Sequence, residues 1–287
     1  MRYFWIPCLA LLLLAPVAAA AEKGGDPWWL DSAWWYEGQL PQPQNHRVTQ
    51  EWSSYTHEDV EVPTLIVRPE GEEPFPGVVW VHGRRGLDDL AQMQVQRLAA
   101  RGFTVVAPDL YSGRFIAAMP IEHDYQLEED LAAAVDFALE LEAVQGPEVC
   151  FVSITRGGYY TLKAAVTHER QHNGVGCMVA FYPHLQDPNA PEPMQVYRHA
   201  PEIGELTIPF LVFVGEHEQY QRKRSIEMSV TTLEAAGRPV RLVEYPGVGR
   251  AFDFRAPPTR TFADDLASRD AIVRTADFLR EHLTQGD

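Results

Sequence analysis

Four short segments of the sequence combine turn-forming residues with side chains that could do chemistry, and each follows a short apolar run. They are His82-Gly83-Arg84-Arg85-Gly86, Thr155-Arg156-Gly157-Gly158, Gly215-Glu216-His217-Glu218 and Pro246-Gly247-Val248-Gly249-Arg250. A hydroxyl, an imidazole and a carboxylate held together can perform nucleophilic catalysis, because the imidazole takes the hydroxyl proton and the carboxylate orients the imidazole. The segments contain such groups, so their chemistry depends on whether the fold brings them together.

The apolar runs predict strands that alternate with amphipathic helices. After two antiparallel strands at 47–56 and 60–68, we expect strands at 78–81, 103–107, 149–154, 178–181, 209–214 and 240–245, and helices at 88–101, 125–143, 157–168, 222–236 and 262–283. Continuous apolar strands between such helices are typical of an α/β fold, a mostly parallel central sheet with helices on both faces. Right-handed crossovers would then place all four segments at the carboxyl edge of the sheet.

The segment from Ser153 to Gly158 has the layout of a nucleophile elbow, a sharp turn between a strand and a helix. Small residues flank such a turn, so that its central side chain, here Thr155, stands exposed above the sheet. The backbone N–H groups near Arg84 and Arg156 would then face a developing oxyanion.

Residues from about 60 to 285 resemble the dienelactone hydrolase family of the α/β-hydrolase superfamily. The resemblance rests on Pro76 to Gly83, Gly102 to Tyr111, Pro209 to Gly215 and Tyr245 to Phe252. It implies an α/β-hydrolase fold and hydrolysis of a small ester or lactone. The implied machinery is a Cys or Ser nucleophile, a His base and an Asp that orients the base, with no cofactor. No Cys or His spacing in the chain predicts a metal site.

The positions that match this machinery carry other residues. Thr155 stands where the family has Cys, Glu218 where it has Asp, Arg250 where it has His, and Gly83 where it has an acidic residue. Glu for Asp is a mild change. Thr155 needs a base to become nucleophilic, and Arg250 cannot be that base because it keeps its proton at ordinary pH. We therefore expect the implied hydrolysis to be weak or lost.

Two functions stay open. A different base, His82, His184 or His217, could restore hydrolysis with Thr155 or with a water. Alternatively, Arg250 could pair with Glu218, because the matching positions face each other in the family. The pair would then either only hold two loops together or, with Arg84, Arg85 and Arg156, form a positive pocket that binds a small carboxylate without catalysis. Tyr111, which follows the strand at 103–107, would line the same pocket with His82, His184 and His217.

The N-terminus predicts export. Residues 1–21 have a positive start at Arg2, an apolar run and the small residues Ala18 to Ala21, which is the layout of a cleaved signal peptide. We place a Trp-rich arm at 22–46, which either packs on the domain or presents a partner surface, and the hydrolase-like domain at 47–287. The protein would be periplasmic or secreted.

The net charge and the cysteines limit the kinds of partner and the redox state that we expect. Arg2 is the one charged residue in 1–21, so the remaining chain has 23 basic against 40 acidic residues and a net charge of −17. Such a surface repels phosphate backbones, which makes nucleic acid a poor partner, and no other segment is apolar enough to suggest a membrane span. Cys150 and Cys177, on strands expected to be neighbours, are either buried free thiols or a disulfide.

Overall fold

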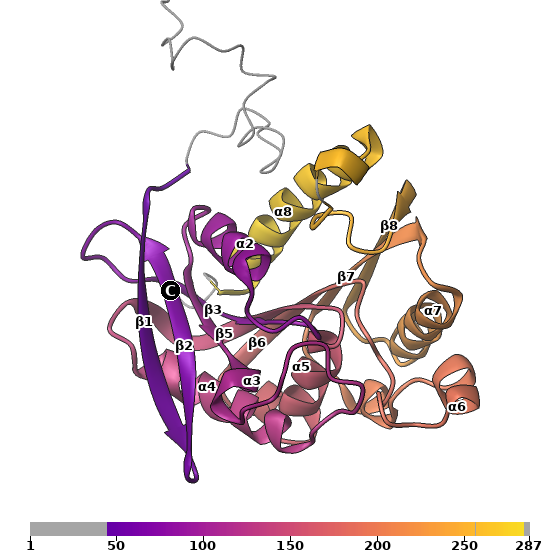
Figure 1. Cartoon of the computed structure of the whole chain (residues 1–287), viewed down its shortest axis with the longest axis horizontal. Coiled ribbons are helices and arrows are strands. Elements are labelled where there is room, and N and C mark those ends of the chain that lie inside the picture. Colours follow the sequence, from indigo (N-terminus) through magenta and orange to yellow (C-terminus); the bar gives the residue numbers. More distant parts are fainter. Residues whose placement is uncertain (1–44, 256, 284–287) are drawn as a thin grey trace, which may run out of the picture.

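A twisted sheet runs through the protein, seen edge-on in Figure 1. The computed structural model describes residues 45–255 and 257–283. In that part of the chain the sheet has the strand order β1-β2-β4-β3-β5-β6-β7-β8. The strands are β1 (Val48–His57), β2 (Val60–Pro69), β3 (Phe75–Val81), β4 (Thr104–Pro108), β5 (Val144–Ile154), β6 (Val175–Phe181), β7 (Phe210–His217) and β8 (Val240–Gly249). β1 and β2 form an antiparallel hairpin at one edge, and the strands from β4 to β8 are parallel, as expected.

Helices cover both faces of the sheet. α2 (Asp89–Ala99) and α8 (Phe262–Leu283) lie on one face, and α4 (Gln126–Glu140), α5 (Gly157–Val166) and α7 (Tyr220–Ala235) lie on the other (Figure 1). Two short helices, α3 (Leu110–Gly113) and α6 (Glu192–Tyr197), and three 3-10 turns, 170–172, 201–205 and 257–259, lie in the connections. The expected α/β-hydrolase architecture is therefore confirmed.

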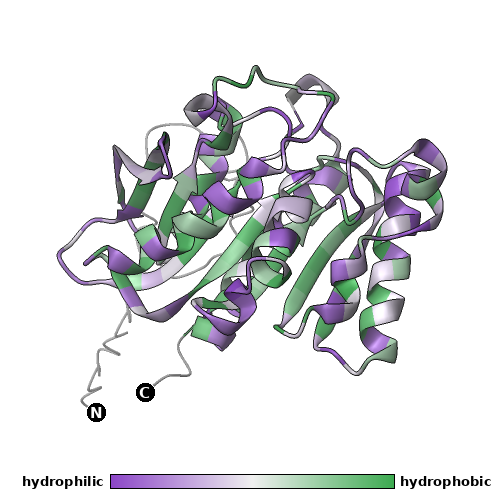
Figure 2. Cartoon of the chain, turned by 90° about the horizontal axis from the view of Figure 1, so that it is seen from below, coloured by the Kyte–Doolittle hydropathy of each residue, from purple (hydrophilic) through white to green (hydrophobic). Residues whose placement is uncertain are grey.

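The sheet separates two apolar layers. Alternate residues of a strand point to opposite faces; accordingly Val79 packs with α4 and α5, while Val78 and Trp80 pack toward α2 and α8. All three side chains are nearly fully buried. Figure 2 shows apolar strands between helices whose outer faces are hydrophilic. Burial on both faces explains why these strands are continuous apolar runs, the pattern that made them predictable.

Several boundaries differ from the sequence prediction. β8 was expected to end at Tyr245, but it continues to Gly249 through Pro246. Proline lacks an N–H and is therefore rare inside a sheet. β8 is an edge strand, where a missing donor leaves no neighbour unpaired. β5 begins at Val144, five residues before the expected start, and the short helices α3 and α6 were not predicted because their four and six residues carry no helical periodicity.

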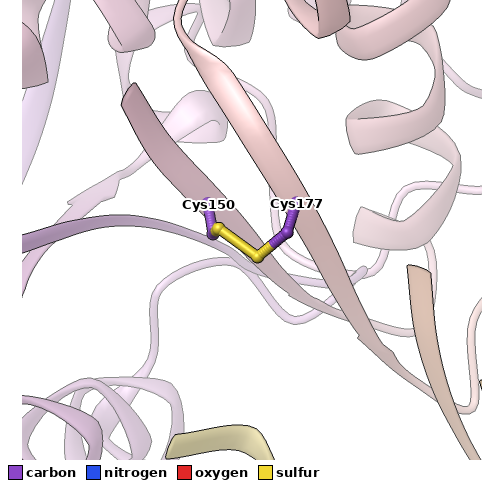
Figure 3. The surroundings of a disulfide bond; sticks show 2 residues. All are labelled: Cys150 and Cys177. Atoms are coloured by element: carbon purple, nitrogen blue, oxygen red, sulfur yellow. A yellow bond between two sulfur atoms is a disulfide. The ribbon is translucent and has the colours of Figure 1, made fainter. Parts of the chain in front are cut away.

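A disulfide joins the two central strands β5 and β6. Cys150 lies opposite Cys177 in the parallel register, with Cα atoms 4.7 Å apart, and the two sulfurs are bonded (Figure 3). Of the two alternatives for this pair, the structure has the disulfide rather than free thiols.

The structure does not test the predictions for the N-terminus. The signal peptide at 1–21, and the arm at 22–46 except for Asn45 and His46, lie outside the described residues. Within the described part of the chain, no helix is both long and apolar enough to cross a bilayer.

Candidate functional site

The residues predicted to do chemistry stand at the carboxyl ends of the strands. Thr155 directly follows β5, Glu218 directly follows β7 and Arg250 directly follows β8. His82 occupies the same place after β3, and His184 comes three residues after β6. Because β3, β5, β6, β7 and β8 are neighbours in this order, the fold brings these five residues to one edge of the sheet.

Thr155 occupies a strained turn between β5 and α5. Its φ angle is 49°, in the left-handed region that β-branched residues rarely adopt. Two glycines let the turn pack closely: a Cβ at Gly157 would lie 2.6 Å from the Val81 carbonyl oxygen, and one at Gly158 would lie 2.4 Å from the Pro183 Cβ. The local structure is thus that of a nucleophile elbow, and its strain is of the kind found at functional positions.

Gly83 and Thr155 fit each other directly. A Cβ at Gly83 would lie only 1.9 Å from the Thr155 hydroxyl oxygen. No side chain at position 83 could coexist with this conformation of Thr155. Gly83 and Thr155 therefore form one steric unit.

Arg250 and Glu218 form the ion pair that was expected from their positions. Arg250 Nη1 donates to Glu218 Oε1 at 2.9 Å, and the same oxygen accepts the Gln219 N–H at 2.9 Å. The Glu218 side chain is fully buried, and that of Arg250 is 19% exposed. Arg250 Cζ also lies 5.4 Å from the centroid of the Tyr182 ring. The guanidinium is held from two sides, as a His–acid pair would be, but it has no lone pair with which to accept a proton.

Tyr182 links Arg250 to a buried carboxyl group, that of Asp253. Its hydroxyl donates to Asp253 Oδ1 at 2.6 Å, and both residues are buried. Burial raises the pKa of Asp253 to about 6, although the hydrogen bond from Tyr182 opposes the rise. Neither residue was singled out from the sequence, because Asp253 follows the strand by four residues and its contact with Tyr182 exists only in the folded sheet.

The Thr155 hydroxyl has no base beside it. In the described residues it forms no hydrogen bond. His82 is engaged elsewhere: its Nδ1 bonds the Gly83 carbonyl at 2.8 Å, and its Nε2 accepts the Leu110 N–H at 3.2 Å. Burial lowers the pKa of His82. This neutral, fully bonded imidazole supports the loop, and His217 is exposed at the end of β7.

His184 is the histidine that lies among the charged residues of the site. Its backbone N–H donates to the Thr155 carbonyl at 2.7 Å, its side chain is almost wholly buried, and its Nδ1 has no hydrogen-bond partner in the described chain. Its pKa lies well below the usual value, first because of burial and then because of nearby guanidinium groups. In decreasing order of effect these belong to Arg222, Arg250, Arg156 and Arg84.

Arg222 is a site residue that the sequence reasoning missed. It is the third residue of α7, and its Nη1 is buried without a hydrogen-bond partner among the described residues. Burial, and after it the charges of Arg250 and Arg156, lower its pKa to about 10, although the charge of Glu218 opposes the shift. The sequence placed the start of this helix at Arg222 itself, whereas α7 begins at Tyr220. The signal that could have identified it is its spacing, one helical turn after Glu218.

Arg84 and Arg156 also hold a loop beside the site. Arg84 Nε and Arg156 Nη1 both donate to the Pro120 carbonyl, at 2.8 and 3.2 Å, and Arg156 Nη2 donates to the Ile121 carbonyl at 2.9 Å. Arg156 Nε is buried without a partner in the described structure. Arg156 precedes the first turn of α5, where backbone N–H groups lack helical acceptors. The oxyanion role of the Arg84 and Arg156 backbones stays a prediction.

The two remaining predicted ligand residues have other partners. Arg85 pairs with Asp88 at 2.5 Å, and its side chain is 59% exposed. Tyr111 is buried, its hydroxyl bonds the Tyr160 hydroxyl at 3.0 Å, and burial raises its pKa. The structure thus places Arg222 rather than Arg85 with the other guanidinium groups. Within the described residues, no group of three or more His, Cys, Asp or Glu could hold a metal ion.

Known proteins resemble this chain over the domain that carries the site. The sequence model of the dienelactone hydrolase family matches residues 62–283. The "Putative carboxymethylenebutenolidase" of Methylorubrum extorquens is 25% identical over 248 residues, which are 78% of this chain and 78% of that protein. Human acyl-coenzyme A thioesterase 6 is 25% identical over 252 residues, 76% of this chain. This chain spans only 57% of that thioesterase.

A solved structure shows the same fold. The crystal structure of the "Putative Dienelactone Hydrolase" from Klebsiella pneumoniae subsp. pneumoniae aligns with a TM-score of 0.65 and 21% identity, covering 84% of this chain and 100% of that one.

Proposed function

Because the chain belongs to the dienelactone hydrolase family, a family that suggests ester or lactone hydrolysis, we propose that it keeps the family's site but uses it to bind a small carboxylate, with triad hydrolysis weak or lost. The observation that carries this proposal is the ion pair of Arg250 and Glu218 at the positions of the family's base and acid. An arginine there removes the general base and supplies a group that recognises carboxylates.

The loss of hydrolysis follows from two positions. Without a base, the Thr155 hydroxyl stays protonated and is a weak nucleophile. Removing the members of a triad lowers kcat by roughly 10⁴- to 10⁶-fold, so only the contribution of an oxyanion hole and of binding would remain.

The gain of anion binding follows from the charge of the site. Four guanidinium groups, those of Arg84, Arg156, Arg222 and Arg250, act on His184, and the carboxylate that pairs with one of them is Glu218. The N-terminal ends of α5 and α7 start beside Arg156 and Glu218, and each adds partial positive charge. An anion is therefore attracted to this edge of an otherwise acidic protein.

A second candidate function is hydrolysis with His184 as a substitute base. It is favoured by the unpartnered Nδ1 of His184 and by the bond from its backbone N–H to the Thr155 carbonyl. A base must become a cation when it takes the proton, and four guanidinium groups oppose a further positive charge on His184. The binding function is accordingly the better supported of the two.

One pair of measurements separates the two functions. The purified protein is screened against p-nitrophenyl esters and lactones, and its melting temperature is measured with small carboxylates. We expect no turnover above that of Thr155→Ala, and a rise in melting temperature that Arg250→Gln abolishes and Arg85→Gln keeps. Turnover that disappears in both Thr155→Ala and His184→Gln would establish the hydrolase instead.

We also propose that the protein is exported. Arg2, the apolar run and the small residues Ala18 to Ala21 support a cleaved signal. The Cys150–Cys177 disulfide supports an oxidising compartment, where such bonds persist. N-terminal sequencing of the protein from a fractionated bacterial expression host tests the proposal. Recovery of an uncleaved chain in the cytoplasmic fraction would contradict it.

A further inference from the structure

Four buried polar atoms without hydrogen-bond partners in the described chain meet at the site. They are His184 Nδ1, Arg222 Nη1, Arg156 Nε and Glu218 Oε2. Buried polar atoms are nearly always paired, because an unpaired one keeps its full desolvation cost. Three of the four belong to groups that can donate to an anion. An anionic group placed beside His184 Nδ1, Arg222 Nη1 and Arg156 Nε would give these three a partner, whereas Glu218 Oε2, itself an acceptor, would gain none.

Glu218 is not hydrogen-bonded to Arg222. It lies four residues earlier, just before α7, and its charge favours the guanidinium of Arg222, but its Oε1 accepts from Arg250 and from the Gln219 N–H. Arg84 and Arg156 each use two guanidinium nitrogens to donate to the carbonyls of residues 119–122. The buried Nη1 of Arg222 has no hydrogen-bond partner among the described residues, and Arg222 has the strongest effect of the four on His184.

The excess of positive charge around His184 indicates how much negative charge a ligand should carry. Four guanidinium groups act on His184, and Glu218 is the carboxylate that pairs with one of them, so guanidinium groups are in excess around His184. A monoanion would neutralise one of them. A ligand with two anionic groups could satisfy the Arg250 side of the site and the Arg222 side together.

Resting on the proposed binding function, we propose that the ligand is a small organic dianion, of which a dicarboxylate is the simplest, and that Arg222 and His184 hold one of its two anionic groups. Arg222 donates to this group from α7, and His184 donates to it through Nδ1. The second anionic group faces Arg250, the residue on which the binding function itself depends.

The test compares two ligands that differ by one charge. Binding of succinate and of monomethyl succinate at pH 7.5 is measured by calorimetry on the full-length mature protein. We expect succinate to bind at least about tenfold more tightly, since a charge-assisted hydrogen bond contributes about that much. In Arg222→Gln the two affinities should become equal, whereas Arg224→Gln, a change on the same helix at an arginine that stacks on Tyr197, should keep the preference.

The outcomes distinguish this inference from the function on which it rests. Equal binding of the two ligands by the unmodified protein, or a preference that survives Arg222→Gln, overturns the dianion assignment and leaves carboxylate binding in place. Failure of both ligands to bind overturns both. The melting temperature without ligand supplies a further check: Arg222→Gln should match or exceed the unmodified protein, and a clear decrease would show that Arg222 is structural.

Discussion

Arg250 Nη1 and Glu218 Oε1 lie 2.9 Å apart, joined by a buried hydrogen bond at the ends of the adjacent strands β8 and β7. Arg250 keeps its proton at ordinary pH and cannot act as a base, while Glu218 lies where it could orient one. Under the proposed function, a base at position 250 and a stronger nucleophile at position 155 are what hydrolysis would need, and substitutions at these positions test that proposal.

The double variant Thr155→Cys, Arg250→His should gain esterase activity. An imidazole at position 250 can donate its N–H to Glu218 and keep its other nitrogen free as a base, and a thiol is more nucleophilic than a secondary hydroxyl. General-base catalysis contributes about 10²-fold or more, so we expect p-nitrophenyl acetate hydrolysis to rise about that much above the unmodified protein. Adding Glu218→Gln to the double variant is the control and should remove most of the gain. If Glu218→Gln left the esterase activity of the double variant unchanged, Glu218 would not be the residue that orients the new base.

Gly83 and Thr155 should be energetically coupled. A methyl group at position 83 would overlap the Thr155 hydroxyl oxygen, at 1.9 Å, and overpacking of this kind costs about 1–3 kcal/mol. In a Thr155→Ala background the overlap disappears and the cost of Gly83→Ala should fall below about 1 kcal/mol. Urea denaturation of the four proteins of this double-mutant cycle measures the coupling. Additive effects would show that the hydroxyl does not occupy this space.

Anion binding should be accompanied by proton uptake at His184. Burial and the guanidinium groups of Arg222 on α7, Arg250 after β8, Arg156 at the start of α5 and Arg84 after β3 hold its pKa well below the usual value, so the free imidazole is neutral at pH 7. An anion beside Nδ1 offsets the positive charge of the guanidinium groups and therefore raises the pKa of His184. Calorimetry of succinate binding in two buffers with different ionisation enthalpies should report uptake of part of a proton, increasing as the pH falls toward 6.5. His184→Gln should show none, and equal apparent enthalpies for the unmodified protein would contradict the prediction.

Asp253 should make the protein less stable as the pH rises. Its pKa is raised from 3.8 in the unfolded chain to about 6 in the folded one, so the folded state binds the proton more tightly. Stability is full below the unfolded value and is lost as the pH rises through about 6, by about 3 kcal/mol in total. Asp253→Asn keeps an acceptor for the Tyr182 hydroxyl and has no charge. We expect the variant to be more stable than the parent at pH 7, with the difference shrinking between about pH 6 and pH 4 in denaturation curves. A constant difference would exclude Asp253 as the titrating group.

Reduction of the disulfide should destabilise the fold. The bond between Cys150 and Cys177 closes a loop with a sequence separation of 27 residues, for which the chain-entropy model gives about 3–4 kcal/mol. Chemical denaturation with and without reductant measures the effect, and Cys150→Ala, Cys177→Ala should be insensitive to reductant. Titration of two free thiols in the denatured, unreduced mature chain would contradict the bond itself.

The strands and long helices could be predicted from the sequence, whereas most contacts between the loops that follow the strands could not. The strands and the long helices followed from apolar periodicity, because burial on both faces of β3 or β5 leaves few polar residues in them. The ion pair of Glu218 and Arg250 followed from the family resemblance, because the two matching positions face each other in the family.

Contacts between separate connections could not be predicted. The guanidinium groups of Arg84 and Arg156 meet at the Pro120 carbonyl, and nothing in the local sequence fixes the path of that loop. The place of Arg222 in the site could not be predicted either. It depends on α7 beginning two residues earlier than expected, and on Glu218 forming its hydrogen bond with Arg250. Side-chain competition of this kind is decided by tertiary packing, which sequence periodicity does not record.

Thr155, Glu218 and Arg250 each stand one residue beyond the end of a strand. Their side chains stand outside the apolar layers on either face of the sheet, although the Thr155 N–H still donates to the Phe181 carbonyl of β6 at 3.1 Å. A substitution at these positions therefore changes reactivity, charge or ligand preference without altering the apolar core. Arg250 and Glu218 are not independent, because replacing one of them leaves the charge of the other buried and unpaired. Divergence of function on such a sheet accordingly requires matched substitutions at neighbouring strand ends.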